Sequence, residues 1–449
     1  MKTPVTAIFD IGKTNKKFFL FDNAFEEVHR QYRQFDLIED EDGYPCEDLQ
    51  SVTDWMRQTF ENVVKSNEYQ VQALNFSGYG ASIVNVDEEG KPATPLYNYI
   101  KPFPQEILDA YYDQYGGKEQ NNLETASPSL GMLNSGLQLY WLKKQRPHLF
   151  QKIKTSLHFP QYLSYVFSGK MVSEPTSIGC HTKLWDFERN QYHSWTAKEG
   201  IDKLFPETVP ATTSFEVAFN SRPVRVGVGI HDSSSALVPY LKELKEPFIL
   251  ISTGTWSITV NPFSEEPLTL EQLRKDCLKF LGVHGKPVKA ARLFLGNEMV
   301  HQIRKLDGIF HKNSGYYKNV LLNPDFLNQM EHGDIDDLFY PETIKNPLVE
   351  EVLSTEQWDP GIFGTYEEAY HHLMWGLVVL QKASLELVIG KTPVKHIIID
   401  GGFVNNTLFV QMLQHELPGY KLSVSSQPLG SALGAAMVVN EGVGDGIVG

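Results

Sequence analysis

The chain has 449 residues, of which 41% are hydrophobic and 21% are charged, as in a soluble globular protein. This length exceeds what one compact core usually contains, so we expect two domains. The formal net charge of −15 argues against nucleic acid or an anionic membrane as the main partner, because like charges repel.

The sequence carries no mark of export or membrane insertion. No N-terminal run combines basic residues with a long apolar stretch, and no segment is expected to supply the roughly 20 apolar residues that span a bilayer. The cysteines Cys46, Cys180 and Cys277 are widely separated and form neither a metal-binding motif nor a disulfide framework. We therefore expect a protein of the reducing cytoplasm.

The N-terminus predicts a strand, a polar turn and a second strand. An apolar run from Val5 ends at Asp10, and a second apolar run ends at Asp22; the turn between them contains Gly12, Lys13, Thr14 and Asn15. Glycine allows close approach of the backbone, and threonine and asparagine add donors, so such a turn can hold a phosphate. For this turn alone, an ordinary β-hairpin is the alternative.

Helices and strands alternate in the rest of the N-terminal half. Apolar spacing predicts a helix over residues 49–65, followed by strands over 71–78 and 83–87. Residues 137–167 look helical, with breaks at Pro147 and Pro160.

A glycine-rich turn at residues 226–236 places one carboxylate, Asp232, beside backbone N–H groups. An acid in such a turn is what transfer of a phosphoryl group onto a hydroxyl needs. The alternative is that Asp232 only caps a helix that begins at Ser233.

The segment 248–260 repeats the N-terminal plan roughly 240 residues later, with Gly254 and Thr255 in its turn. Two such units predict two halves that hold a polyphosphate from both sides. We place the boundary between 240 and 247, which gives domains of residues 1–243 and 244–449.

Two further elements lie near the C-terminus. Residues 366–389 predict a long core-facing helix. At 396–407 a strand runs into Gly401 and Gly402, and a helix begins near Asn406. The glycines would let a base or ribose lie against the backbone, and Asn406 either caps the helix or binds the nucleotide.

Together these motifs resemble, in order and spacing and over nearly the whole chain, the FGGY family of carbohydrate kinases within the actin/hexokinase/Hsp70 ATPase superfamily. The segment 10–15 is similar to its first phosphate motif, 252–255 to its second, and 401–406 to its adenosine motif. The phrases around Asp232 and Gly254 look most like the rhamnulokinase and fuculokinase branch.

The resemblance implies an α/β fold with two ribonuclease-H-like domains around a central cleft that closes on ATP and sugar. It makes the N-terminal domain the one with the sugar site and catalytic base, and the C-terminal domain the nucleotide-binding one. It implies Asp232 as general base and Asp10 as the residue that organises Mg²⁺ through water. The phosphates would lie against Gly12, Lys13, Thr14, Asn15, Gly254 and Thr255, and the nucleoside against Gly401, Gly402 and Asn406.

The chain departs from the family pattern at three places. Lys13 replaces a small polar residue, and either contacts phosphate or points outward. Phe403 stands where a third glycine is common. The usual sugar-binding segment is replaced, which leaves Tyr79 and Asn98 as candidates that either line the sugar pocket or only pack.

The resulting expectation is an ATP-dependent kinase that phosphorylates a primary hydroxyl of a ketose, such as a 6-deoxyketohexose or a pentulose. A nucleotide-gated binding module and a catalytically weak sugar-sensing relative are the alternatives. The chain ends without an added peptide-binding region, which disfavours the first of them. Relatives are often homodimers, but no sequence feature decides the oligomeric state.

Overall fold

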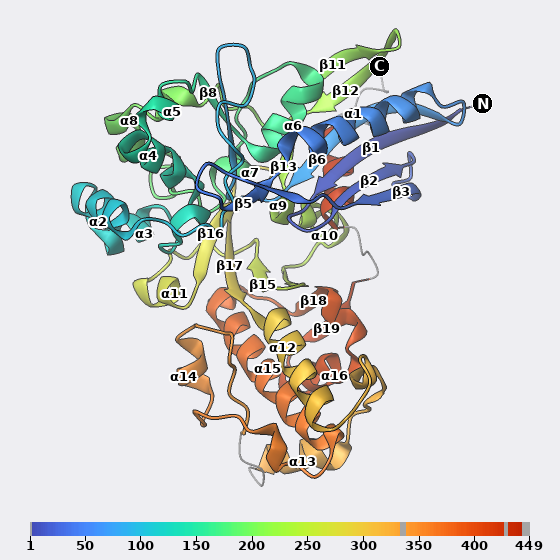
Figure 1. Cartoon of the computed structure of the whole chain (residues 1–449). Coiled ribbons are helices and arrows are strands. Elements are labelled where there is room, and N and C mark those ends of the chain that lie inside the picture. Colours follow the sequence, from blue (N-terminus) through green and yellow to red (C-terminus); the bar gives the residue numbers. More distant parts are fainter. Residues whose placement is uncertain (1, 333–337, 426–429, 442–449) are drawn as a thin grey trace. The chain divides into compact units, whose positions relative to one another are not determined.

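A computed structural model describes residues 2–332, 338–425 and 430–441 (Figure 1). The chain divides into two compact units. Unit 1 contains Met1–Glu243, Lys279–Pro287 and the segment that carries the last helix, α17 (Gly430–Val439). Unit 2 contains Leu244–Leu278 and Val288–Pro428. The main segment of unit 1 ends at Glu243, and unit 1 also includes two later segments. The division into domains of residues 1–243 and 244–449 stays a prediction.

Unit 1 is built on a mixed sheet in the order β11-β12-β6-β1-β2-β3, with the short β13 paired to β6. Its strands are β1 (Thr3–Ile11), β2 (Lys16–Phe21), β3 (Glu27–Arg33), β6 (Tyr69–Gly78), β11 (Ser214–Phe219), β12 (Arg222–Gly227) and β13 (Ile230–His231). Three two-stranded sheets pair β4 (Leu37–Glu39) with β5 (Pro45–Glu47), β7 (Ile83–Val86) with β8 (Thr155–His158), and β9 (Trp185–Asp186) with β10 (Gln191–Tyr192). The β1, β6 and β13 strands run parallel, so their carboxyl ends share one edge of the sheet.

The central strand β1 alternates its side chains between two apolar layers. Phe9 packs in the core that contains the inner face of α1 (Leu49–Lys65), whereas Ile8 packs with Ala435 and Ala436 of α17. The predicted helix over 49–65 is confirmed, with Asp48 as its N-cap. Helices on both faces explain why β1 is apolar almost throughout, because neither face meets water.

The remaining helices of unit 1 are α2 (Gln105–Gln114), α3 (Lys118–Glu124), α4 (Ser135–Gln145), α5 (Pro147–Phe150), α6 (Phe159–Ser168), α7 (Pro175–Ile178), α8 (Ser194–Glu199), α9 (Asp232–Ala236) and α10 (Val238–Glu243). Of these helices, α6 packs on the main sheet, whereas α2, α4 and α8 share a separate apolar cluster that contains Tyr111, Tyr140 and Trp195. The expectation of helix across 137–167 is wrong in its middle, where β8 intervenes. Pro147 and Pro160 lie in the first turns of α5 and α6, where the missing N–H of proline costs nothing.

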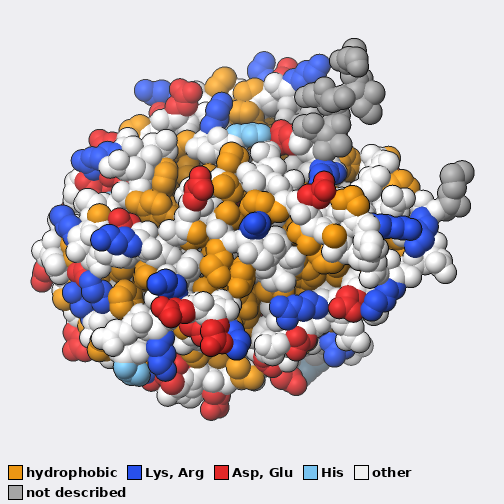
Figure 2. All heavy atoms as spheres, turned by 90° about the horizontal axis from the view of Figure 1, so that it is seen from above, with side chains coloured by type: hydrophobic (Ala, Val, Ile, Leu, Met, Phe, Trp, Pro, Cys, Tyr) orange, Lys and Arg blue, Asp and Glu red, His pale blue; other side chains and the backbone are white. Residues whose placement is uncertain are grey.

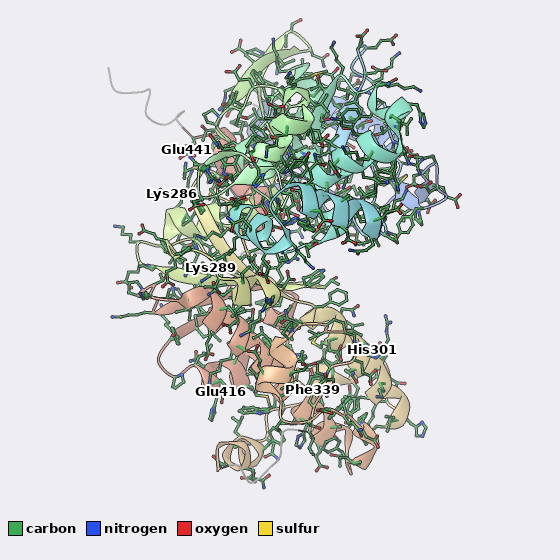
Figure 3. All side chains as sticks on the ribbon, turned by 90° about the vertical axis from the view of Figure 1, so that its left-hand side faces the viewer. Lys286, Lys289, His301, Phe339, Glu416 and Glu441 are labelled. Atoms are coloured by element: carbon green, nitrogen blue, oxygen red, sulfur yellow. The ribbon has the colours of Figure 1, made fainter. Side chains whose placement is uncertain are left out.

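A second mixed sheet, in the order β16-β17-β15-β14-β18-β19, belongs to unit 2 except for Lys279–Leu281 of β16 and Pro287 of β17, which fall in unit 1. The strands of this sheet are β14 (Phe248–Thr253), β15 (Ser257–Asn261), β16 (Cys277–Leu281), β17 (Pro287–Leu293), β18 (His396–Gly401) and β19 (Lys421–Val424). The turn that joins β16 to β17 is closed by a hydrogen bond from the Gly282 N–H to the Lys286 carbonyl. Figure 3 labels Lys286 in this turn and Lys289 in β17. The β14 and β18 strands are parallel and end together at Thr253 and Gly401.

The helices of unit 2 are α11 (Leu270–Arg274), α12 (Leu295–Ile309), α13 (Pro324–His332), α14 (Leu348–Val352), α15 (Tyr366–Ile389) and α16 (Thr407–Glu416). The predicted core helix at 366–389 is confirmed as α15, capped by Thr365. By length and composition α15 could cross a membrane, which the sequence analysis did not foresee. However, 67% of its most apolar window is buried inside the protein, as in the core helix of a globular fold.

Candidate active site

The shared carboxyl edge of β1, β6 and β13 brings together three of the predicted residues of unit 1. Asp10 lies near the end of β1, Tyr79 directly follows β6, and Asp232 directly follows β13. The backbone N–H of Tyr79 donates to the carbonyl of Ile11 at 3.3 Å, which joins the first two strand ends. Ligands of α/β proteins usually bind at this edge of a parallel sheet, so this is the candidate site of unit 1.

Asp232 is the first residue of α9, and the N-cap position belongs to His231. The carboxyl group of Asp232 accepts a hydrogen bond from the Ser233 N–H at 2.6 Å, and its side chain is 34% exposed. The pKa of Asp232 is raised to about 7, chiefly because the surrounding protein removes water from the carboxyl group and secondly because Asp10 is negatively charged. A carboxyl group that titrates near neutrality and remains reachable has the properties of a general base.

Asp10 is buried and paired with Lys17, whose Nζ lies 3.1 Å from Oδ2 of Asp10. The charge of Asp10 raises the pKa of Lys17, and the charge of Asp232 contributes in the same direction. Lys17 is a site residue that the sequence analysis missed. The sequence could have indicated it, because Lys17 lies in β2, directly after the turn that joins this strand to β1.

The β1–β2 turn is closed by a hydrogen bond from the Gly12 N–H to the Asn15 carbonyl at 3.1 Å. Thr14 and Asn15 are exposed, and the Asn15 side chain accepts a hydrogen bond from Gln34. The Lys13 side chain turns inward, so that its Nζ lies 3.5 Å from Oε1 of Glu47. The structure therefore gives the turn an exposed half and a half that faces the protein.

A buried network behind Asp232 was also missed. Nε2 of His231 lies 3.0 Å from Sγ of Cys180, and Nδ1 lies 3.0 Å from Oγ of Ser234. Ser234 donates its own proton to the Leu281 carbonyl at 2.8 Å, so Nδ1 of His231 is the donor in their contact. Gly80 permits this packing, because a Cβ atom there would overlap the sulfur of Cys180.

The two candidates for the sugar pocket lie in different environments. Tyr79 is buried, and its hydroxyl has no hydrogen-bond partner among the described residues. Asn98 is buried as well, but its amide donates to the Pro45 carbonyl at 2.9 Å and its oxygen accepts from the Ile100 N–H at 3.3 Å. Asn98 thus already joins its own loop to β5, whereas the Tyr79 hydroxyl makes no hydrogen bond to the described residues.

In unit 2, the ends of β14 and β18 bring the second phosphate motif beside the adenosine motif. Oγ1 of Thr253 donates to the Asp400 carbonyl at 2.6 Å and accepts from the Phe403 N–H at 2.9 Å. Gly401 has φ +88°, and a Cβ atom there would overlap the Thr253 carbonyl, so only glycine fits. The neighbouring Gly402 has no such contact.

The turn after β14 is closely packed against α12. The Thr255 carbonyl accepts a hydrogen bond from the Asn297 N–H at 3.0 Å, and a Cβ atom on Gly296 would overlap the Gly254 carbonyl. Gly296 is a further residue that the sequence analysis missed, because the contact joins segments about 40 residues apart.

Asn406 is the N-cap of α16. Its oxygen accepts from the Phe409 N–H at 3.2 Å, and its amide donates to the Tyr370 hydroxyl at 2.9 Å. The side chain is buried, so capping is the role that these contacts show.

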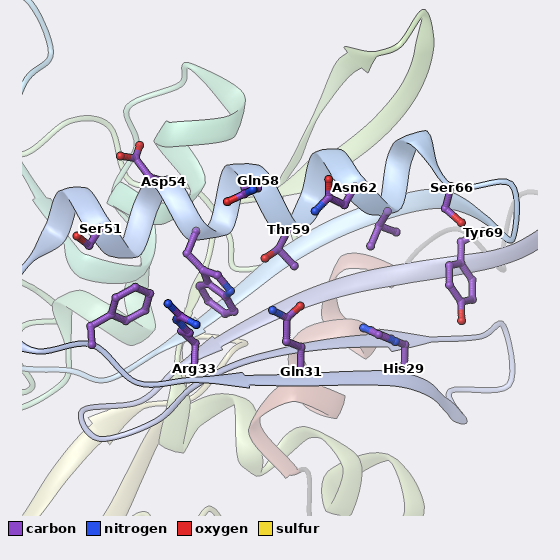
Figure 4. Close-up of a pocket in the computed structure, with 13 residues that line it drawn as sticks. His29, Gln31, Arg33, Ser51, Asp54, Gln58, Thr59, Asn62, Ser66 and Tyr69 are labelled. Atoms are coloured by element: carbon purple, nitrogen blue, oxygen red, sulfur yellow. The ribbon is translucent and has the colours of Figure 1, made fainter.

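No group of three or more His, Cys, Asp or Glu side chains that could hold a metal occurs in residues 2–332, 338–425 and 430–441. A groove of about 810 Å³ lies between α1 and β3 and contains none of the predicted site residues (Figure 4). Acidic and basic side chains are interspersed over the described part of the face shown in Figure 2.

Comparison with solved structures shows which proteins share this fold. The fold matches solved carbohydrate kinases with the actin-like α/β architecture. One from Novosphingobium aromaticivorans has a TM-score of 0.82 at 24% identity, over 98% of this chain and 92% of that one. A glycerol kinase of Plasmodium falciparum solved with ADP has a TM-score of 0.77 at 15% identity, over 98% and 89%.

The chain belongs to the FGGY family of carbohydrate kinases, whose N-terminal domain matches residues 5–231. A rhamnulokinase of Halalkalibacterium halodurans is 27% identical over 263 residues, which are 55% of this chain and 52% of that protein. An L-fuculokinase of Escherichia coli K12 is 23% identical over 219 residues, 47% and 45% of the two chains. These matches span about half the length of the curated relatives. The expected family and fold class are thereby confirmed.

Proposed function

We propose that this protein transfers the γ-phosphoryl group of ATP to a hydroxyl of a small sugar, with Asp232 as the general base. The observation that carries the proposal is the position of Asp232 at the carboxyl edge of β1, β6 and β13, partly exposed and with its pKa raised to about 7. A base of that pKa is half ionised at neutral pH and can accept the proton of an attacking hydroxyl.

The nucleotide would be held by backbone groups more than by side chains. In the proposal, Gly12, Thr14 and Asn15 of unit 1 and Gly254 and Thr255 of unit 2 contact the phosphates. Gly401 and Gly402 lie against the nucleoside. Glycine-bounded turns that follow strands supply N–H donors for this purpose without the bulk of a side chain.

The residues present are suited to Mg²⁺. Asp10 and Asp232 are two carboxylates close enough for the charge of one to raise the pKa of the other. Mg²⁺ in kinases is usually held by one or two carboxylates, water and the substrate phosphates. In the proposal Asp10 organises the ion through water, and the ion neutralises charge on the phosphates when bound.

We propose a ketose as the acceptor, phosphorylated on a primary hydroxyl. The support is the similarity to a rhamnulokinase, an L-fuculokinase and a probable L-xylulose kinase of Haemophilus influenzae. The three cysteines are buried and form no disulfide, which suits a reducing cytoplasm where ATP is available. A homodimer stays a prediction.

The test is release of ADP across a panel of L-rhamnulose, L-fuculose, L-xylulose, D-xylulose and glycerol. Strong stimulation by one ketose supports the kinase, sugar-independent hydrolysis indicates a nucleotide-gated module, and sugar binding without turnover indicates a sensor. For the stimulating sugar, Asp232→Asn should reduce turnover about 10²–10⁴-fold while ATP binding is retained. Turnover that survives this substitution would remove Asp232 from the proposal.

A further inference from the structure

The Lys13 side chain lies against two aromatic rings and one carboxylate. Its Nζ lies 5.4 Å from the ring centre of Tyr79 and 5.2 Å from that of Tyr99. The third neighbour is Glu47, the last residue of β5, at 3.5 Å. Tyr79 is one of the two residues that the sequence offers for the sugar pocket, and Tyr99 directly follows the other one, Asn98. Lys13, which replaces a small polar residue of the family's phosphate motif, therefore lies next to residues in or beside the segment that replaces the family's usual sugar-binding segment.

Apart from the 3.5 Å ion pair between Glu47 and Lys13, three buried polar atoms of this cluster have no hydrogen-bond partner among the described residues. They are Oε1 of Glu47, the hydroxyl of Tyr79 and Oγ of Ser82. All three side chains are at most 6% exposed. An unpaired buried polar group costs about 1–3 kcal/mol, so several in one place need a reason. A ligand that supplies donors and acceptors is such a reason.

Glu47 is held through one of its carboxylate oxygens, and the other oxygen faces Lys13. Its Oε2 lies 2.7 Å from Nζ of the buried Lys16, which also donates to the Lys13 carbonyl at 2.8 Å. Oε1 faces Lys13, whose side chain is 25% exposed and thus reachable from solvent. The cationic donor is therefore reachable from solvent, and the buried carboxylate lies next to it, so a ligand that draws Lys13 aside would meet Oε1 of Glu47.

Resting on the proposed function, we infer that Lys13 and Glu47 form a clamp for two neighbouring hydroxyls of the acceptor sugar. One hydroxyl accepts a hydrogen bond from Nζ of Lys13, and its neighbour donates to Oε1 of Glu47. The rings of Tyr79 and Tyr99 form the apolar wall beside them. Lys13 is then a specificity residue of the acceptor pocket and not a phosphate ligand.

The clamp selects an uncharged acceptor with a vicinal diol. A carboxylate on the sugar would meet the charge of Glu47, which Lys16 holds in place. With a sugar that lacks one of the two hydroxyls, one of the two charged groups would have no hydrogen bond to the sugar. Sites built on such hydrogen bonds strongly reject an analogue that lacks the hydroxyl. To reach a phosphate instead, Lys13 would have to leave Glu47 and both rings.

The deciding variant is Lys13→Met, which keeps the length of the side chain and removes its charge. Binding of the panel sugars without nucleotide is measured by calorimetry, and KM for the sugar and for ATP by coupled assay. We expect at least a tenfold loss of sugar affinity and a tenfold higher sugar KM, with ATP KM changed less than twofold. Lys91→Met, on an exposed turn, is the matched control and should change nothing.

A second variant, Glu47→Gln, should weaken the same sugar similarly, and its melting temperature shows whether loss of the Lys16 pair has unfolded the protein. The clamp is overturned if Lys13→Met raises ATP KM and spares the sugar, or if gluconate binds the wild type as tightly as the neutral sugars. A wild type that binds a sugar but never phosphorylates it contradicts the proposed function and leaves the clamp to be judged by binding. A wild type that binds none of the sugars contradicts both.

Discussion

Nε2 of His231 lies 3.3 Å from Oδ1 of Asp232, so the imidazole and the carboxyl group form a close pair at the end of β13. Burial lowers the pKa of His231 to about 3, and the ring is therefore neutral across the neutral pH range. The pKa of Asp232 is raised to about 7. Of the two groups, Asp232 is thus the one that titrates where a kinase works.

The first prediction concerns the pH dependence of activity. Because only the ionised carboxylate accepts a proton, kcat/KM should increase with pH up to about 7 and level off above it. Lys17→Met removes a positive charge that lowers the pKa of Asp232, so this variant should move the acid limb to higher pH. The rate profile from pH 5.5 to 9 measures both. A limb that stays in place in Lys17→Met would mean that ATP or another group titrates instead.

The second prediction concerns stability. The pKa of Asp232 in the folded protein, about 7, lies above its ordinary value of 3.8, so the folded state holds the proton more tightly than the unfolded state. Ionisation of Asp232 therefore costs stability progressively between pH 4 and 7, and the full cost is present above pH 7. Asp232→Asn should be more stable than the wild type at pH 8, by about 1–2 kcal/mol after allowance for solvent screening of a partly exposed group. Urea unfolding at pH 5 and pH 8 compares the two proteins, and an equal difference at both pH values would contradict the linkage.

The third prediction uses two adjacent glycines. Gly401→Ala introduces a Cβ atom that overlaps the Thr253 carbonyl, at a residue with φ +88°, so we expect a loss of at least about 2 kcal/mol and of nucleotide affinity. Gly402→Ala is the control, because the nearest atom to its Cβ would be 3.8 Å away. Thermal unfolding and ADP titration of both variants check this. Similar behaviour of the two would show that the β14–β18 junction tolerates a side chain.

Local patterns in the sequence predict the elements that carry the site. The apolar periodicity of α1 and α15 and the strand-glycine turns at Gly12 and Gly254 are properties of short segments. The contacts of Lys13 with Glu47 and of His231 with Cys180 join residues 34 and 51 positions apart, respectively, and a single sequence does not show that these residues are in contact. The packing of α17 in unit 1 likewise joins segments that are far apart in the sequence. Its support comes from the Asn75 amide, which donates to the Ala435 carbonyl across 360 positions.

The fourth prediction concerns two glycines of α12. Gly296→Ala would push on the Gly254 carbonyl, and we expect it to raise ATP KM at least tenfold, because it displaces the second phosphate turn. Gly308→Ala lies in the same helix with open space around its Cβ. This control should stabilise the protein by about 0.5–1 kcal/mol through helix propensity, with ATP KM unchanged. An unchanged ATP KM in Gly296→Ala would show that the turn does not contact phosphate.

The last prediction separates the two interpretations of Asn406. Asn406→Ala removes the acceptor of the Phe409 N–H and should destabilise the protein by about 1 kcal/mol. Asn406→Asp keeps an acceptor at the start of α16, where the helix dipole favours a negative charge, and the Tyr370 hydroxyl can turn to donate to it. Stability should therefore be largely retained in this variant.

If Asn406 acts only as a cap, ATP KM stays within twofold of the wild type in both variants, and only Asn406→Ala has a lower melting temperature. If its amide binds the nucleotide, both variants lose ATP affinity, because neither alanine nor aspartate can supply the amide donor. The structure favours the first outcome, since the amide already donates to Tyr370 and the oxygen already accepts from Phe409. Melting temperature and ATP KM measured on the same two variants decide between them.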